Sequence, residues 1–131
     1  MRTALLVATA TAVASLLVPL LTGCDRAGPE QQMQVARAIG NPDRGRRVIR
    51  ARHCGSCHTI PGVRGADGVV GPPLDFFSRR TFIAGEVPNT PANLVRWVTD
   101  PQSIEPRTAM PAVGLDARDA HDVVAYLYTL Q

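Results

Sequence analysis

Two cysteines and a histidine are the residues whose types and spacing could do chemistry together. They stand in the run Cys54-Gly55-Ser56-Cys57-His58. Two thiols three residues apart on one turn can bond to the two vinyl groups of one porphyrin, and the next side chain is then directed at the iron. The motif therefore predicts one covalently attached haem c, with Cys54 and Cys57 as attachment points and His58 as the proximal iron ligand.

Three other uses of the cysteine pair are weaker alternatives. A redox dithiol is expected among alternating strands and helices, and the sequence shows no such pattern. A structural zinc site needs four ligands, and no second pair of cysteines or histidines is present. A plain disulfide suits an oxidising compartment but gives no reason for the adjacent histidine.

The sixth iron ligand has four candidates, which are Met33, His53, Met110 and His121. Met110 is favoured because it lies in a Pro-containing loop before the last predicted helix, where an extended backbone can direct its thioether across a haem pocket. Methionine more commonly fills a gap in a core, so this alternative stays open. His53 lies too close to the cysteines, Met33 lies in a tether, and His121 is predicted to be an exposed helix residue.

The first 23 residues are predicted to be an export signal. Ala4 to Leu21 is almost unbroken apolar sequence, and it ends in Leu21-Thr22-Gly23-Cys24. This ending resembles the lipobox of bacterial lipoproteins, in which cleavage falls before the cysteine and its thiol receives a lipid. We therefore expect lipidation at Cys24 and a location on the outer face of the cytoplasmic membrane, with the haem domain in the periplasm. An uncleaved anchor and ordinary cleavage are the alternatives.

The rest of the chain divides into residues 24–40, predicted to be the lipidated cysteine and a flexible tether, and residues 41–131, predicted to be a monohaem domain. The tether is polar with little apolar pattern. Fully extended, it would span at most ~55 Å. It would let the domain sweep over a membrane partner.

Three main helices are predicted. The first runs from Asn41 to about His53, the second from Thr90 to the residue before Pro101, and the third starts at Asp116. Their apolar positions are Gly45, Val48 and Ile49, then Leu94, Trp97 and Val98, then Val123, Val124, Leu127 and Leu130. About 36 residues rich in glycine and proline separate the first two helices, and aromatic residues make up 5% of the chain. A loop this long and a core this thin are expected if the loops wrap a large apolar cofactor.

These features together resemble the class I cytochromes c, over the segment from Gly45 to Leu130. The matching motifs are Cys54-Cys57-His58, Gly71-Pro72-Pro73-Leu74, Leu94-Val95-Arg96-Trp97-Val98 with Pro101, Met110-Pro111, and Ala125-Tyr126-Leu127. The sequence looks closest to the cytochrome domains fused to subunit II of haem-copper oxidases, although we expect no copper domain before it. The resemblance implies an all-α, small cytochrome c fold around one covalently bound haem.

The resemblance also implies roles for further residues. The carbonyl of Pro72 would accept a hydrogen bond from His58, and Leu74 and Trp97 would line the haem pocket. Arg79 or Arg80 looks like a partner of a haem propionate, with a solvated loop as the alternative reading of both. Tyr126 would pack the last helix against Gly45.

Charge gives weaker indications of partners. All 14 basic residues are arginine, and 11 acidic residues leave a net charge of +3, which is too mild to indicate nucleic acid. Arg44, Arg46, Arg47, Arg50 and Arg52 make the first helix basic. This face is either solvated or docks on an acidic partner or anionic lipid.

The sequence therefore predicts an electron carrier and not an enzyme. With His58 and Met110 both on the iron, no position remains for oxygen or peroxide. We expect a membrane-anchored carrier in a respiratory chain, between a quinol-oxidising complex and a terminal oxidase. The alternatives are a haem subunit of a periplasmic dehydrogenase complex and a haem-based ligand sensor.

Overall fold

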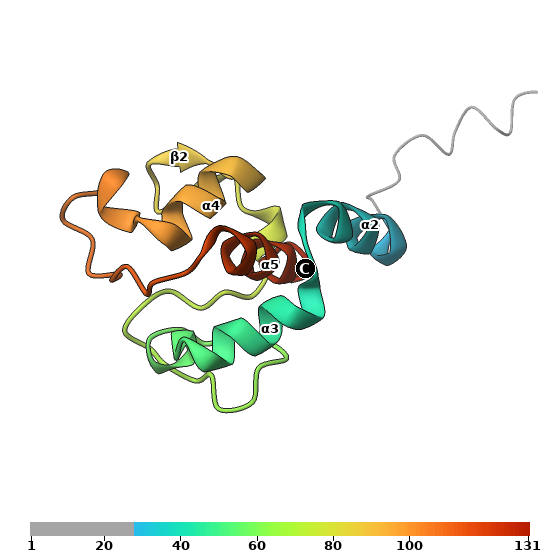
Figure 1. Ribbon diagram of the computed structural model, residues 1–131, viewed down its shortest axis with the longest axis horizontal. Coiled ribbons are helices and arrows are strands. Elements are labelled where there is room, and N and C mark those ends of the chain that lie inside the picture. The colour runs from blue at the N-terminus through green and yellow to red at the C-terminus, as the bar shows by residue number, and fades with distance from the viewer. Residues whose placement is uncertain (1–27) are drawn as a thin grey trace, which may run out of the picture.

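The computed structural model describes residues 28–131, and it shows helices and long loops arranged around one core (Figure 1). The α-helices are α2 (Pro29–Ile39), α3 (Pro42–Ala51), α4 (Pro91–Thr99) and α5 (Ala117–Leu127). Short elements are the 3-10 turns η2 (Cys54–Ser56), η3 (Phe77–Arg79) and η4 (Pro101–Ser103) and the strands β1 (Phe82–Ile83) and β2 (Val87–Pro88). The predicted all-α class is confirmed. The predicted signal and Cys24 lie outside the described residues.

The starts of the three predicted helices are confirmed by their caps. The side chain of Asn41 accepts a hydrogen bond from the amide of Arg44 at 2.9 Å. Thr90 caps α4 through the amide of Asn93, and Asp116 caps α5 through the amide of Asp119 at 2.7 Å. Side-chain oxygens thus satisfy amides that a helix start leaves without a partner.

Helices α3 and α5 cross in direct backbone contact. A β-carbon on Gly45 would collide with the carbonyl of Asp122, so only glycine fits at this position. Asp122 is buried, with its side chain 6% exposed; its carboxylate accepts a hydrogen bond from the amide of Asn41 at 2.7 Å and forms an ion pair with Arg44. The predicted packing of α5 against Gly45 is present, and the α5 backbone at Asp122 makes the nearest contact. The contribution of Tyr126 to this packing stays a prediction; its phenol donates to the carbonyl of Pro61 at 2.5 Å.

Helix α2 overturns part of the predicted tether. Residues 29–39 form a helix that packs on α5 (Figure 1). Ala36 is completely buried, and the side-chain amide of Gln32 donates to the carbonyl of Tyr128 at 2.6 Å. A helix that buries so few side chains leaves almost no apolar periodicity in the sequence, which is why it reads as a tether. Of the predicted tether, only residues 24–28 precede this helix.

The long loop between α3 and α4 contributes its own part of the core. Its buried apolar residues are Ile60, Val63, Ala66, Phe77 and Ile83. Within it, β1 and β2 pair antiparallel, and the turn between them holds Ala84 and Gly85 at positive φ. Two strands of two residues are too short for an alternating pattern to reveal them. Within residues 28–131, no helix is both long enough and apolar enough to cross a membrane.

Candidate haem pocket

The two cysteines of the motif lie on one tight turn directly after α3. The backbone reverses at His53, whose φ is 56°, and enters the turn η2. The carbonyl of Cys54 accepts from the amides of Cys57 at 3.2 Å and His58 at 3.0 Å. Cys54 and Cys57 are not joined by a disulfide, and burial raises the pKa of the Cys54 thiol. The turn therefore presents two sulfurs and an imidazole from five consecutive residues.

The ring of His58 is fixed from two sides. Its Nδ1 lies 2.7 Å from the carbonyl oxygen of Pro72, which is the hydrogen bond that the resemblance implies. Gly71 lies against the ring so closely that a β-carbon there would collide with it. When Nδ1 donates its proton to this carbonyl, the lone pair of Nε2 is left to bind a metal.

A cavity of about 650 Å³ opens in front of this histidine. Its lining includes the predicted residues Cys54, Cys57, His58, Pro72, Leu74, Arg80, Trp97 and Met110. Most of the remaining wall is apolar, and it comes from the loops together with α3, α4, α5 and β1. The volume lies in the usual range for cofactor sites. An apolar cavity with two thiols and one oriented imidazole on its wall fits haem c.

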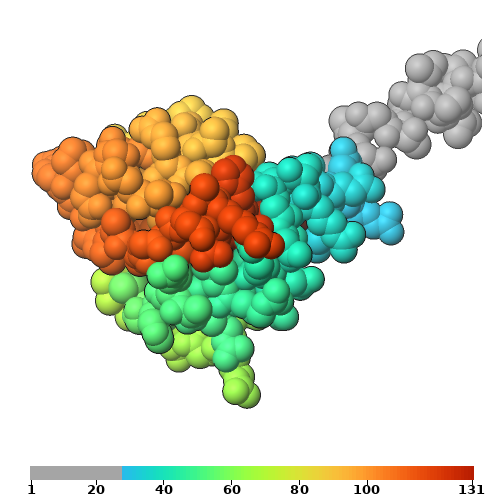
Figure 2. All heavy atoms as spheres, viewed as in Figure 1, coloured from blue at the N-terminus to red at the C-terminus, as the bar shows by residue number. Residues whose placement is uncertain are grey.

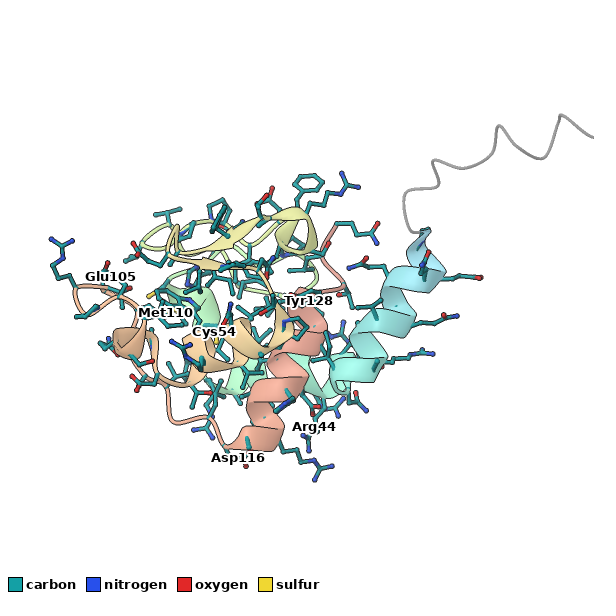
Figure 3. All side chains as sticks on the ribbon, turned by 90° about the horizontal axis from the view of Figure 1, so that it is seen from above. Arg44, Cys54, Glu105, Met110, Asp116 and Tyr128 are labelled. Atoms are coloured by element: carbon teal, nitrogen blue, oxygen red, sulfur yellow. The ribbon has the colours of Figure 1, made fainter. Side chains whose placement is uncertain are left out.

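Met110 reaches the cavity from a loop that hydrogen bonds hold in place. Its amide donates to the hydroxyl of Thr108 at 3.2 Å, and its carbonyl accepts from the side chain of Gln102 at 2.8 Å. Met110 and Cys54, both labelled in Figure 3, line the same cavity. The structure thus brings the predicted sixth ligand into the pocket that holds the attachment residues.

The other candidate ligands lie elsewhere or are constrained. His53 lines the cavity but stands on the same turn as Cys54. Met33 lies on α2, in a separate groove. His121 is exposed on α5, with its Nδ1 2.7 Å from the carbonyl oxygen of Ala117. Of the four candidates, Met110 is the one that lines the cavity from a segment other than the cysteine turn.

The structure separates the two arginines that were predicted as propionate partners. Arg80 lines the cavity, stacks on the ring of Phe77 at 5.1 Å and donates to the carbonyl of Asp75 at 3.2 Å. Arg79 is exposed, does not line the cavity and stacks on Phe76 at 5.4 Å. The geometry therefore favours Arg80 for the haem role.

Two charged residues on the cavity wall were missed from the sequence, Arg52 and Glu105. Arg52 reaches Asp119 at 3.8 Å and the carbonyl of Val113 at 3.5 Å, so it joins the end of α3 to the first turn of α5 and to the segment before it. In the sequence, only its position two residues before Cys54 indicated that Arg52 could lie at the haem site. No sequence pattern marks Glu105, because it lies in an irregular loop.

Comparisons with known proteins agree with this site. The family model described as cytochrome c matches residues 42–131. Over 90 residues, the chain is 34% identical to cytochrome c oxidase subunit 2 of Alkalihalophilus pseudofirmus. The match covers 68% of this chain and 25% of that relative, so the chain spans about a quarter of the relative's length. With its thiols, oriented histidine and apolar cavity, the chain belongs to the cytochrome c family and is a class I c-type cytochrome that resembles the oxidase-fused domains.

Proposed function

We propose that this protein is a single-electron carrier, anchored through a lipid on Cys24 to the outer face of a bacterial cytoplasmic membrane. The observation that carries the proposal is that His58 and Met110 line the same cavity as the two attachment thiols. Haem c, when bound, supplies an iron that changes by one electron between ferrous and ferric. His58 and Met110 as axial ligands would leave no iron position for a substrate, which favours a carrier over an enzyme or a sensor.

The residues around the cavity would favour the reduced state of a bound haem. A thioether opposite a histidine raises the reduction potential of a haem iron. Leu94 and Val98, at 1% and 5% exposed, keep water away from the α4 wall. Because an apolar wall disfavours the additional charge of ferric iron, these residues act in the same direction as Met110.

A terminal oxidase is the acceptor that the comparisons support. The relative is named a subunit of cytochrome c oxidase. The carrier would then take electrons from a quinol-oxidising complex and deliver them to the oxidase, either as a shuttle or as a bound subunit. Anchoring beside both membrane complexes would shorten the distance of delivery.

The basic face of α3 is the surface proposed to meet an acidic partner. Among the described residues, Arg44 pairs with Asp122 and Arg52 with Asp119, whereas Arg46, Arg47 and Arg50 are exposed and form no ion pair. Three unpaired cations on one short helix attract a partner through long-range electrostatics that salt screens. We expect Arg47→Glu with Arg50→Glu to slow electron transfer at low salt, and Arg118→Glu on α5 to change it little.

Purification from solubilised membranes tests the assignment to an oxidase. The affinity-tagged, haem-loaded chain is expected to copurify with terminal oxidase subunits, and oxygen consumption with a quinol substrate should fall when the chain is deleted. Cys24→Ser should move the chain out of the membrane fraction. Copurification with a dehydrogenase and unchanged oxygen consumption would contradict the oxidase assignment.

A further inference from the structure

The first turn of α2, the turn η3 and the C-terminus together form a surface that the electron-carrier role does not use. We propose that this surface, called here the α2–η3 face and consisting of Pro29, Met33, Phe76, Arg79 and Gln131, lies against the phospholipid headgroups of the membrane. The inference rests on the anchoring at Cys24 that is proposed above. It adds a second membrane contact, which fixes the orientation of the domain.

The length of the chain before α2 brings this face to the lipid. Five residue steps join Cys24 to Pro29, and they can span at most about 18 Å. Pro29 is the first residue of α2 and lines the groove of the α2–η3 face. A lipid on Cys24 would therefore hold the groove within a few residue lengths of the headgroups. A flexible tether of sixteen residues would not keep the groove so close to the headgroups.

Helix α2 transmits this restraint because it is fixed to the domain. The side chain of Gln32 donates to the carbonyl of Tyr128, and Ala36 is completely buried against the core. On the other side of the groove, both the amide and the hydroxyl of Ser78 donate to the carbonyl of Leu130, at 3.0 Å and 2.7 Å. The α2–η3 face is thus a rigid part of the fold.

Phe76 gives the face a side chain suited to a membrane interface. It is 52% exposed although it is aromatic, and its φ of 52° is strained for a bulky residue. The guanidinium of Arg79 stacks on its ring at 5.4 Å. An aromatic ring with a stacked cation combines an apolar body with a charge that can meet a lipid phosphate.

The groove beside Phe76 is also mostly apolar. It has a volume of about 400 Å³ and is lined by Pro29, Gln32, Met33, Pro61, Phe76, Thr129, Leu130 and Gln131. Glu30, exposed in the first turn of α2, opposes the positive charge of Arg79. Because these two charges offset each other, binding should depend mainly on the aromatic and apolar contacts, with Arg79 placed to meet a lipid phosphate.

This contact would orient the haem pocket. Helix α2 lies at one end of the long axis of the molecule, and the orange loop that carries Met110 lies at the other (Figures 1 and 2). In Figure 3, Tyr128 lies toward α2, whereas Met110 and Glu105 lie at the far end. With the α2–η3 face on the lipid, the Met110 side of the pocket points away from the membrane (Figures 1 and 3).

Thiol accessibility in vesicles tests the proposal. In the haem-loaded, lipidated chain the native cysteines are all bonded, so an added cysteine is the single free thiol. Gln131→Cys reports on the α2–η3 face, and Val69→Cys is the control because Val69 is 88% exposed beside the cavity wall. In vesicles of phosphatidylethanolamine and phosphatidylglycerol, we expect a membrane-impermeant maleimide to react at least tenfold more slowly with Gln131→Cys than with Val69→Cys.

Two further variants show whether lipid contact causes the protection. Adding Phe76→Ser and Arg79→Glu to Gln131→Cys should bring its rate within about twofold of the control, whereas Arg118→Glu, with the same charge change, should leave it slow. Equal rates for Gln131→Cys and Val69→Cys in membrane-bound protein would overturn the proposed face and leave the anchor intact. Recovery of the chain in the soluble fraction would overturn both the proposed face and the anchor at Cys24. The haem spectrum of the same sample tests the electron-carrier role separately.

Discussion

The crossing of α3 and α5 and the cavity beside it are built in opposite ways. At the crossing, protein atoms fill the space, with no room for a β-carbon on Gly45 and with Val124 completely buried. The cavity, by contrast, leaves about 650 Å³ between apolar walls. The crossing is specified by the chain's own packing, whereas the cavity is shaped for a group that the chain does not encode. The stability of the crossing should therefore depend on small residues and buried polar contacts. The stability of the region around the cavity should depend on bound haem.

The largest expected effect is on the cavity. Replacing both Cys54 and Cys57 by alanine removes both thioether bonds, so no covalent haem should remain after denaturation. Because an empty apolar cavity is unfavourable, the variant should also lose most of its thermal stability. Haem staining on a denaturing gel and mass spectrometry check the first point. Ser56→Ala, which changes only the exposed residue between them, should retain covalent haem.

The next largest effect is at the crossing. Gly45→Ala places a β-carbon against the backbone of Asp122, which can move only if the helices separate. We expect a loss of about 3 kcal/mol in the free energy of unfolding, measured with urea on the haem-loaded protein. Gly28→Ala is the matched control, because nothing lies within 4 Å of its added carbon. Equal stability of the two variants would show that the crossing is not tightly packed.

A smaller effect is expected from the buried carboxylate beside that glycine. Asp122→Ala leaves Arg44 and the amide of Asn41 without their acceptor, and the loss should be about 2 kcal/mol after allowance for the partial exposure of Arg44. Asp119→Ala removes a more exposed pair at 3.8 Å and should cost less than about 1 kcal/mol. Urea unfolding at neutral pH compares the two. A larger loss for Asp119→Ala would contradict this ranking.

The smallest expected effect depends on pH. Burial raises the pKa of Tyr126 and of Tyr128 in the folded protein. The unfolded chain therefore releases these protons first, and stability should fall as the pH rises above the ordinary tyrosine value of about 10. Tyr126→Phe and Tyr128→Phe should each make this decline in stability less steep. At neutral pH each variant should be less stable than the unaltered protein, because Tyr126→Phe loses the hydrogen bond to Pro61 and Tyr128→Phe loses the one to Asn89. Urea unfolding from pH 7 to 11 measures both slopes, and an unchanged slope in both variants would contradict the assignment.

The sequence was most informative where one residue has one local role. The cap of each predicted helix follows from side-chain chemistry at Asn41, Thr90 and Asp116, and the attachment motif follows from spacing alone. Met110 could be placed because it is a thioether in a loop that the fold must bring back to the cofactor. These features need no knowledge of the distant parts of the chain.

The features that were missed depend on tertiary contacts. Helix α2 buries one residue completely, Ala36, and so has no periodic signal. Asp122 reads as a polar helix position, but its carboxylate is buried by α3. Arg79 and Arg80 differ by one position in an irregular turn, and only the three-dimensional path of η3 shows which of them reaches the cavity. Such contacts are made by residues far apart in the sequence.

The absorption spectrum of membranes that contain the haem-loaded chain, compared with Met110→Ala, tests the central claim most directly. Because His58 and Met110 line one cavity with the two attachment thiols, we expect a low-spin c-type spectrum in both oxidation states. The methionine-to-iron charge-transfer band should be present in the oxidised protein and absent in Met110→Ala, and only the variant should bind carbon monoxide when reduced. A low-spin spectrum and an intact band in Met110→Ala would contradict the assignment of Met110, and the absence of covalent haem from the unaltered chain would contradict the account as a whole.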